Sequence, residues 1–314
     1  MRSGGWGRWL RLVFLGAVVV FGGLFVERRW HDVQQALSRL AAPPVAGSFI
    51  LATLGSYTTM LSWRRLLADY GSPLPLRVVS RVFFVGQLGK YIPGSVWSVV
   101  AQAELGRDYQ VPRPASVTVS IVSVAQTVFA GVVFGVFLLP LGLPSLAREY
   151  WWVALIIPVY AVVLQPVVIA EVTHFVFRLT HLEPPHRDPS YRGLVGALGW
   201  TVVSWLLFGL HAWLLTIGLG GPAPRLLPVC VGAFALAFSV GLVSVPVPAG
   251  VGVREAVFTV LVGSVIGVGE AIAVALLSRV MLALVDFGLA GGQAVWNSRL
   301  ERRVENAVRR HDHS

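Results

Sequence analysis

Charged side chains are scarce in this 314-residue chain: they make up 13% of it, while 55% of its residues are hydrophobic. A soluble domain carries about 25% charged residues, so this composition excludes an ordinary soluble protein. Several apolar runs approach or exceed the roughly 20 residues that a helix needs to cross a bilayer. The runs are continuous and lack the alternating pattern of a membrane barrel. The sequence therefore predicts an all-α, polytopic membrane protein.

Cysteine occurs once, as Cys230 within an apolar run, which excludes a disulfide framework. The chain also lacks a Walker A loop, the HExxH, GxSxG and paired-cysteine motifs, and a D-x-D acidic pair. We therefore expect no metal, no cofactor and no enzymatic activity. His211 lies within an apolar run and is expected to be a hydrogen-bonded core residue. The net charge of +10 does not indicate nucleic acid, because the arginines lie at the ends of the apolar runs.

Six apolar runs are predicted to cross the membrane completely. They are residues 10–26, 45–67, 114–141, 151–172, 194–219 and 271–296. We expect the first to be a retained helix, because no small-residue cleavage site follows it. The arginines of the connecting segments place both termini in the cytoplasm by the positive-inside rule. The expected organisation is one transmembrane domain over residues 1–298 and a basic cytoplasmic tail over residues 299–314.

Two further apolar regions, residues 76–105 and 226–266, are interrupted by proline and glycine. The arms of the first are roughly 12 to 16 residues long, too short at about 1.5 Å per residue to cross a core of about 30 Å. This region is either one kinked span or a re-entrant hairpin, and the arginine count favours the hairpin. The second break, VSVPVPAGVGVRE, predicts a hairpin from the opposite face, although its first arm is long enough to span alone. Two broken hairpins of this kind indicate an inverted repeat.

The chain contains a single lysine, Lys90, in the first break, and Arg254 follows the second break. The start of a half-helix offers free backbone N–H groups and the positive end of a dipole, which together attract an anion. Charges at membrane depth are functional by default. We predict that the two breaks meet near the midplane and form a site for a lipid phosphate. Its predicted members are Lys90, Tyr91, Pro93, Gly94, Ser95, Gly250, Gly252 and Arg254.

Four other charged residues are expected to balance the charge of this site. They are Glu104, Glu255, Arg279 and Asp286. Arg279 and Asp286 are seven residues apart and share one face of the last span. They are expected either to form structural ion pairs with charges of the hairpins or to act as a proton relay. Structural roles stay open for the two main cations as well. Lys90 would then offset the dipole of the first arm, and Arg254 would pair with Glu255 or Glu104.

The stretches GQLGKYIPGSVW and PVPAGVGVREA resemble the two signature stretches of the lysylphosphatidylglycerol synthase transmembrane region family. This is the flippase-like domain of the multiple peptide resistance factor. SWRRLLADYG resembles the arginine-rich segment of that family, and Arg279 falls where the family often places an arginine. The resemblance extends from about residue 10 to residue 298, with Ala249 where a second glycine is common. It implies a lipid translocator, and we expect this chain to lack the soluble synthase domain of the fused relatives.

From these observations we expect the protein to flip or scramble an anionic phospholipid or a polyprenyl-phosphate-linked lipid across the bacterial cytoplasmic membrane. Its expected partners are anionic lipids and a glycosyltransferase or synthase that acts on them; a homo-oligomer is left open, and nucleic acid is not expected. Two alternatives remain. One is an integral-membrane lipid or glycosyl transferase that uses Lys90, Tyr91 and Glu104, and the other is a non-transporting partner of a glycosyltransferase.

Overall fold

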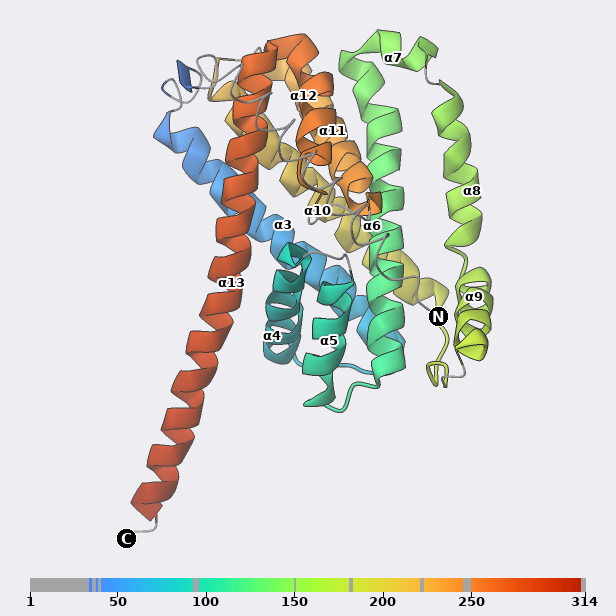
Figure 1. The fold of residues 1–314 in the computed structure, drawn as a ribbon, viewed down its shortest axis with the longest axis vertical. Coiled ribbons are helices and arrows are strands. Elements are labelled where there is room, and N and C mark those ends of the chain that lie inside the picture. Colours follow the sequence, from blue (N-terminus) through green and yellow to red (C-terminus); the bar gives the residue numbers. More distant parts are fainter. Residues whose placement is uncertain are drawn as a thin grey trace, which may run out of the picture.

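The computed structural model describes residues 34–35, 38, 41–92, 96–149, 151–180, 183–220, 223–244 and 250–311, so the first predicted span lies outside the described residues. Within these ranges the fold is helical and contains no strand, which confirms the all-α class (Figure 1). The elements are α3 (Ala42–Asp69), α4 (Leu76–Gln87), the 3-10 turn η1 (Leu88–Tyr91), α5 (Trp97–Arg107), α6 (Arg113–Gly142), α7 (Pro144–Glu149), η2 (Trp151–Leu155), α8 (Ile156–Val163), α9 (Pro166–Leu179), α10 (Tyr191–Ile217), α11 (Ala223–Val243), α12 (Val253–Ile266) and α13 (Val268–His311).

Among the described helices, five are long and apolar enough to cross a membrane. They are Ala42–Asp69, Arg113–Gly142, Tyr191–Ile217, Leu226–Val243 and Val268–Gln293. Four of these coincide with predicted spans. The fifth is the first arm of the predicted second hairpin. The chain is therefore a multi-pass membrane protein.

The predicted span over residues 151–172 is not one straight helix. Its two halves, Trp151–Val163 and Pro166–Leu179, meet at an angle of 72°. The cause is Pro166, because a proline disfavours helical backbone in the residue before it. Gln165 accordingly has a ψ of 140° and begins a new helix instead of continuing the old one. The continuous hydropathy of this run concealed the bend.

Helices α3 and α10 cross in contact along a seam of small and hydroxyl side chains. Ser62 Oγ donates to the carbonyl of Ala197 at 2.9 Å, and Thr58 Oγ1 lies 2.9 Å from Ser204 Oγ. Such polar bonds between close-packed small residues join helices in an apolar medium, where hydrophobic burial provides little attraction. This seam forms a rigid support behind α4, α5 and α13 (Figure 1).

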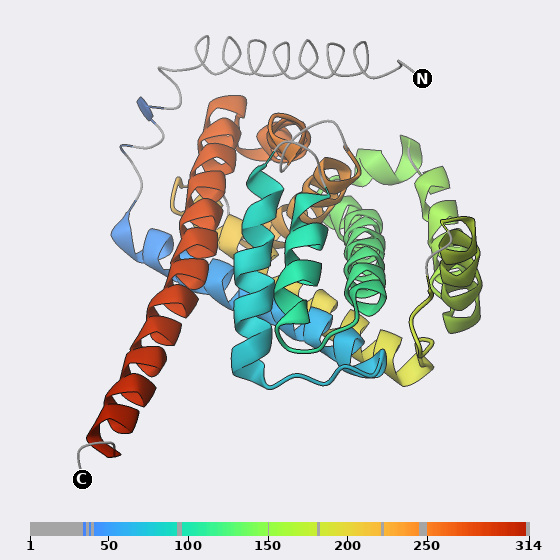
Figure 2. The same ribbon diagram turned by 60° about the horizontal axis from the view of Figure 1, so that its bottom comes forward.

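The first interrupted region is a hairpin and not a single kinked span. α4 and α5 lie side by side, with their outer ends at the same end of the bundle (Figures 1 and 2). Glycine makes this approach possible. A Cβ at Gly89 would lie 2.6 Å from the carbonyl carbon of Trp97, and one at Gly86 would lie 3.2 Å from the amide nitrogen of Gln102.

Helix α13 runs beside both halves of the molecule and extends beyond the bundle to His311 (Figure 1). The predicted basic tail therefore continues the last helix for most of its length. Its sequence, NSRLERRVENAVRRH, contains neither proline nor glycine, so no helix breaker interrupts it.

The contact at Gly89 predicts a specific instability. Gly89→Ala places a Cβ against the backbone of Trp97, and overpacking of this kind costs about 1–3 kcal/mol. We expect a lower thermal unfolding midpoint in detergent micelles. Gly199→Ala on α10 is the control, since a Cβ there meets nothing within 4 Å. Equal midpoints for Gly89→Ala and the unmodified chain would contradict the close packing of the hairpin.

Candidate functional site

The start of α12 is fixed by two glycines with left-handed backbone. Gly250 and Gly252 have φ angles of 65° and 82°, which side-chain-bearing residues rarely adopt. A Cβ at Gly250 would also lie only 2.8 Å from Cα of Gly241 on α11. Close approach and backbone conformation therefore both require glycine here. Gly252 is the N-cap of α12, so the helix begins next to α11, and its first turn lies against that helix.

Arg254 lies in that first turn and packs against two aromatic rings of α11. Its Cζ atom is 4.5 Å from the ring centroid of Phe234 and 4.7 Å from that of Phe238. Both distances are typical of cation–π contacts, which partly replace the water that a buried cation loses. Over the described ranges, Arg254 makes no hydrogen bond and no ion pair. It is therefore a cation in an aromatic environment, and none of the described residues is its bonded counter-ion.

Glu255, the next residue, joins the start of α12 to α13. One carboxylate oxygen, Oε2, accepts a hydrogen bond of 2.6 Å from the backbone N–H of Gly252 and so caps the helix. The other, Oε1, lies 2.5 Å from Nη1 of Arg279 on α13. Both oxygens of Glu255 are thus used in contacts other than with Arg254. The sequence alternative in which Arg254 pairs with Glu255 is not what the structure contains.

The turn of the first hairpin contacts α13 through a second ion pair. Lys90 Nζ lies 2.6 Å from Oδ2 of Asp286, and the hydroxyl of Tyr91 donates to the same oxygen at 2.7 Å. The ring of Tyr91 also stacks on that of Phe287, with centroids 5.2 Å apart. Asp286 therefore anchors η1, as Arg279 anchors α12. The expectation that Arg279 and Asp286 share a face and pair with the hairpins agrees with this geometry.

These side chains form one electrostatic unit. We use the term charged cluster for Lys90, Tyr91, Arg254, Glu255, Arg279 and Asp286. The charge of Arg254 interacts with Glu255, Arg279, Asp286 and Tyr91, so the two hairpin turns lie within each other's electrostatic field. Three cations face two carboxylates, which leaves one positive charge without a compensating side chain in the cluster. An uncompensated charge that is partly shielded from water is costly, which makes this cluster the candidate site.

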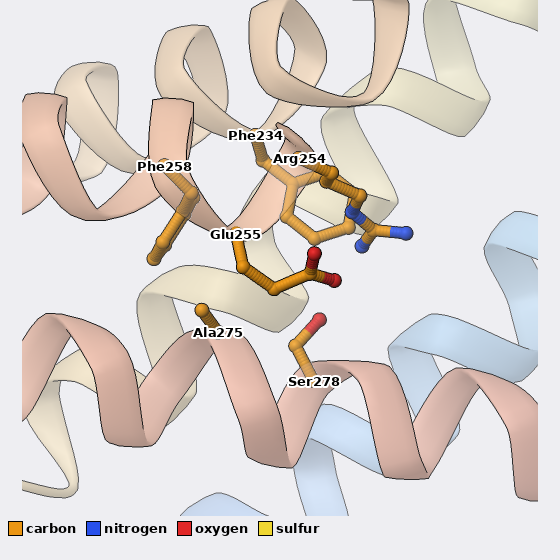
Figure 3. Close-up of a pocket in the computed structure, with 6 residues that line it drawn as sticks. All are labelled: Phe234, Arg254, Glu255, Phe258, Ala275 and Ser278. Carbon is orange, nitrogen blue, oxygen red and sulfur yellow. The ribbon is translucent and has the colours of Figure 1, made fainter. Parts of the chain in front are cut away.

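A narrow cavity adjoins the charged cluster. It is lined by Phe234, Arg254, Glu255, Phe258, Ala275 and Ser278 (Figure 3). The view shows the Glu255 carboxylate and the Ser278 hydroxyl pointing into the same space beside Arg254. Its size is about the minimum that can hold one water molecule. A phosphate group is larger than a water molecule and does not fit in this cavity without movement of its lining.

The remaining predicted site residues lie elsewhere or outside the described residues. Glu104 is half exposed near the end of α5 and pairs with Arg107 at 3.1 Å and Arg113 at 2.5 Å, far along the hairpin from its turn. The hydrogen bond from Arg107 is the main reason that the pKa of Glu104 is below its ordinary value. Glu104 is thus not brought into the charged cluster. Pro93, Gly94 and Ser95 lie outside the described residues.

Three residues of the site were not singled out from the sequence: Phe234, Phe238 and Ser278. The two phenylalanines are four residues apart in an apolar helix, a spacing that equally describes ordinary core packing. Ser278 was marked only by preceding Arg279. Nothing in the sequence distinguishes these side chains from their neighbours until α11, α12 and α13 are packed together.

The fold and this cluster define a class: a polytopic membrane protein with a broken-helix hairpin and a second helix start, which meet at partly buried charges. The chain matches the family model described as lysylphosphatidylglycerol synthase TM region over residues 8–289, and it belongs to that family. No curated protein matches it. Family membership associates the chain with a function that involves membrane lipids, and it confirms the resemblance carried by the two glycine-rich stretches.

The Lys90–Asp286 pair allows a test by a double-mutant cycle. Asp286→Leu leaves Lys90 without its partner. We expect a loss of about 1–3 kcal/mol, between the values for exposed and buried pairs, because the Lys90 side chain is 32% exposed and that of Asp286 11%. Lys90→Met combined with Asp286→Leu removes both charges and is expected to recover part of this loss. The measurement is the unfolding midpoint in detergent.

The matched comparison is Glu104→Gln, which breaks exposed ion pairs and should change the midpoint little. Strictly additive effects of the two single substitutions would mean that Lys90 and Asp286 do not interact energetically.

Proposed function

We propose that this protein translocates an anionic phospholipid or a polyprenyl-phosphate-linked lipid across the bacterial cytoplasmic membrane, by flipping or scrambling, and that the lipid phosphate binds at the charged cluster. One observation carries the proposal. Arg254 is a cation at a helix start, beside a cavity, and no side chain of the described residues forms an ion pair with it. A phosphodiester carries one negative charge and would compensate it.

The surrounding ion pairs give the incoming phosphate further ligands. Lys90 and Arg279 are each held by a carboxylate, at 2.6 Å and 2.5 Å. A phosphate can replace a carboxylate as the partner of either cation, because both are anionic oxygen acceptors. Asp286 would then keep the hydroxyl of Tyr91, and Glu255 would keep the backbone N–H of Gly252. Exchange of partners therefore opens the cluster without leaving a carboxylate wholly unbonded.

The small cavity implies that binding requires movement. The two hairpin turns are separate pieces of chain, and each forms one ion pair with α13, from Lys90 to Asp286 and from Glu255 to Arg279. If the phosphate separates Lys90 from Asp286 or Arg279 from Glu255, it also loosens a hairpin from α13. We propose that this coupling lets the lipid head group pass the narrow cavity between α11, α12 and α13, while the acyl or polyprenyl chains remain in the membrane.

The orientation follows from the arginines. The end of α3, the outer ends of α4 and α5 and the C-terminus of α13 lie at the same end of the bundle (Figure 1). Arginine is concentrated there, at Arg64, Arg65, Arg77, Arg107 and Arg113. The positive-inside rule supports a cytoplasmic location for that end and for both termini.

The proposal predicts loss of translocation when the cations are removed. In proteoliposomes containing fluorescent phosphatidylglycerol or phosphatidylcholine, we expect protein-dependent movement of the anionic lipid. Lys90→Ala and Arg254→Gln should slow it at least tenfold, because each removes a phosphate ligand worth a charge-assisted hydrogen bond. Arg254→Lys keeps the charge and should retain part of the rate. Dithionite quenching of the outer-leaflet fluorophore measures the rate.

Arg178→Ala is the matched control, because Arg178 is exposed on α9 and bonds only to the backbone of its own helix among the described residues. Its rate should be unchanged. Full activity of both Lys90→Ala and Arg254→Gln would refute the phosphate site. Mass spectrometry of the recovered lipid adds a second readout, since a chemically altered lipid would identify a transferase instead.

A further inference from the structure

His211 is a fully buried titratable residue directly behind the cavity. It lies on α10 with 0% of its surface exposed. Both ring nitrogens are hydrogen-bonded. Nδ1 lies 2.6 Å from Ser48 Oγ and 3.0 Å from the Ser48 carbonyl oxygen, and Nε2 lies 2.9 Å from Ser278 Oγ. Since Ser278 also lines the cavity, one hydroxyl separates the imidazole from the charged cluster.

The contacts determine where the protons lie when the imidazole is neutral. A carbonyl oxygen only accepts, so Nδ1 must carry hydrogen to bond the Ser48 carbonyl. The Ser48 hydroxyl donates to the backbone carbonyl of His211 at 3.1 Å, which leaves its oxygen free to accept from Nδ1. Nε2 is then unprotonated and accepts from the hydroxyl of Ser278. In this state the Ser278 proton points at His211 and away from the cavity.

Protonation of His211 reverses the bond to Ser278. Nε2 gains a hydrogen and becomes a donor, so Ser278 Oγ becomes the acceptor. The Ser278 hydroxyl proton must then turn to another acceptor, and the cavity is where its side chain points (Figure 3). An anion in the cavity gains a donor by this change. Among the side chains that line the cavity, the anionic acceptor is the Glu255 carboxylate, whose two oxygens are already bonded.

The charge of Arg254 couples the imidazole to the occupancy of the cavity. The ring of Phe234 contacts both: the Arg254 guanidinium lies 4.5 Å from its centroid, and the His211 ring is steeply inclined to it with centroids 5.8 Å apart. Side chains in contact with His211 include Ser48 of α3, Phe234 of α11 and Ser278 of α13, and Arg254 of α12 contacts the same Phe234 ring. Of the described groups, Arg254 is the charged one whose field reaches His211. Its positive charge opposes an imidazolium, and an anion bound to Arg254 removes that opposition.

We propose that His211 and Ser278 form a proton-binding site that fills when an anion occupies the cavity beside Arg254, so that the lipid phosphate and one proton are bound together. The inference rests on the proposed function for the identity of the anion. A singly charged phosphodiester and a proton carry no net charge when they are transported together. A pH difference across the membrane would then drive movement of the lipid. This difference would be the energy source, since the sequence contains no Walker A nucleotide-binding motif.

The test is the titration of His211 in protein labelled with ¹⁵N-histidine, in detergent micelles, with His211→Gln to assign the signal. We expect saturation with dihexanoyl-phosphatidylglycerol to raise the titration midpoint of His211 by at least about one pH unit, a tenfold change in proton affinity. Arg254→Gln should raise it without any lipid. The exposed His174, paired with Asp188 at 3.1 Å, is the internal control and should not respond.

The outcomes separate this inference from the proposed function. If the lipid binds and the midpoint of His211 stays the same, the proton site is wrong and the phosphate site stands. If the lipid does not bind, the proposed function fails, and the titration of His211 in Arg254→Gln tests the coupling without lipid. A raised midpoint in this variant supports coupling between Arg254 and His211, and an unchanged midpoint overturns it. In Ser278→Ala, lipid affinity should lose its dependence on pH, while an affinity that still follows pH would also overturn the proposal.

Discussion

The arrangement of the site depends on two opposite charges of α13, Arg279 and Asp286, which hold the two hairpin turns. They are seven residues apart, so they face the same side at a separation of about 10 Å along the helix axis. Each carries one ion pair, to Glu255 at the start of α12 and to Lys90 at the end of η1. The cap of α12 belongs to the same arrangement, because the Glu255 carboxylate that pairs with Arg279 also accepts the backbone N–H of Gly252, and a backbone group left unpaired at membrane depth is costly. The charges that stabilise the hairpins are thus also the charges that an anion can compete for.

Much of the fold could be predicted because hydropathy and helix breakers are local properties. The spans near α3, α6, α10 and α13 follow from apolar runs, and the short arms of α4 and α5 follow from the position of the Pro93–Gly94 break in the sequence. The bend at Pro166 was missed because the residues on both sides are equally apolar, and a proline within such a run is also tolerated in straight spans. Its effect depends on whether neighbouring groups satisfy the freed backbone, which is a tertiary property.

The site was predictable in its residues but not in its pairing. The notable positions Lys90, Arg254, Arg279 and Asp286 are unusual because they are charges in apolar sequence, which can be seen without a structure. Glu104 met the same criterion and yet pairs at the outer end of α5, because its position along the helix, and not its charge, determines which partner it reaches. Phe234 and Ser278 carry no such mark. An aromatic ring under a guanidinium and a serine between a histidine and a cavity become meaningful only through contacts made by three separate helices.

The single lysine has a geometric explanation in the Asp286 contact. Lys90 and Tyr91 both bond to Oδ2 of Asp286, so this one oxygen accepts from two neighbouring residues of a tight 3-10 turn. A lysine ammonium is a compact point charge that can share an oxygen with a phenol, whereas the planar arginine fork tends to engage both carboxylate oxygens and would compete with Tyr91. Arginine at this position would therefore lock Asp286 in a bidentate pair. A monodentate ammonium on a flexible stem bonds one oxygen of Asp286 together with Tyr91 and can change its position by rotation about its own side-chain bonds, which is a geometric reason for a lysine here in a chain that otherwise uses arginine.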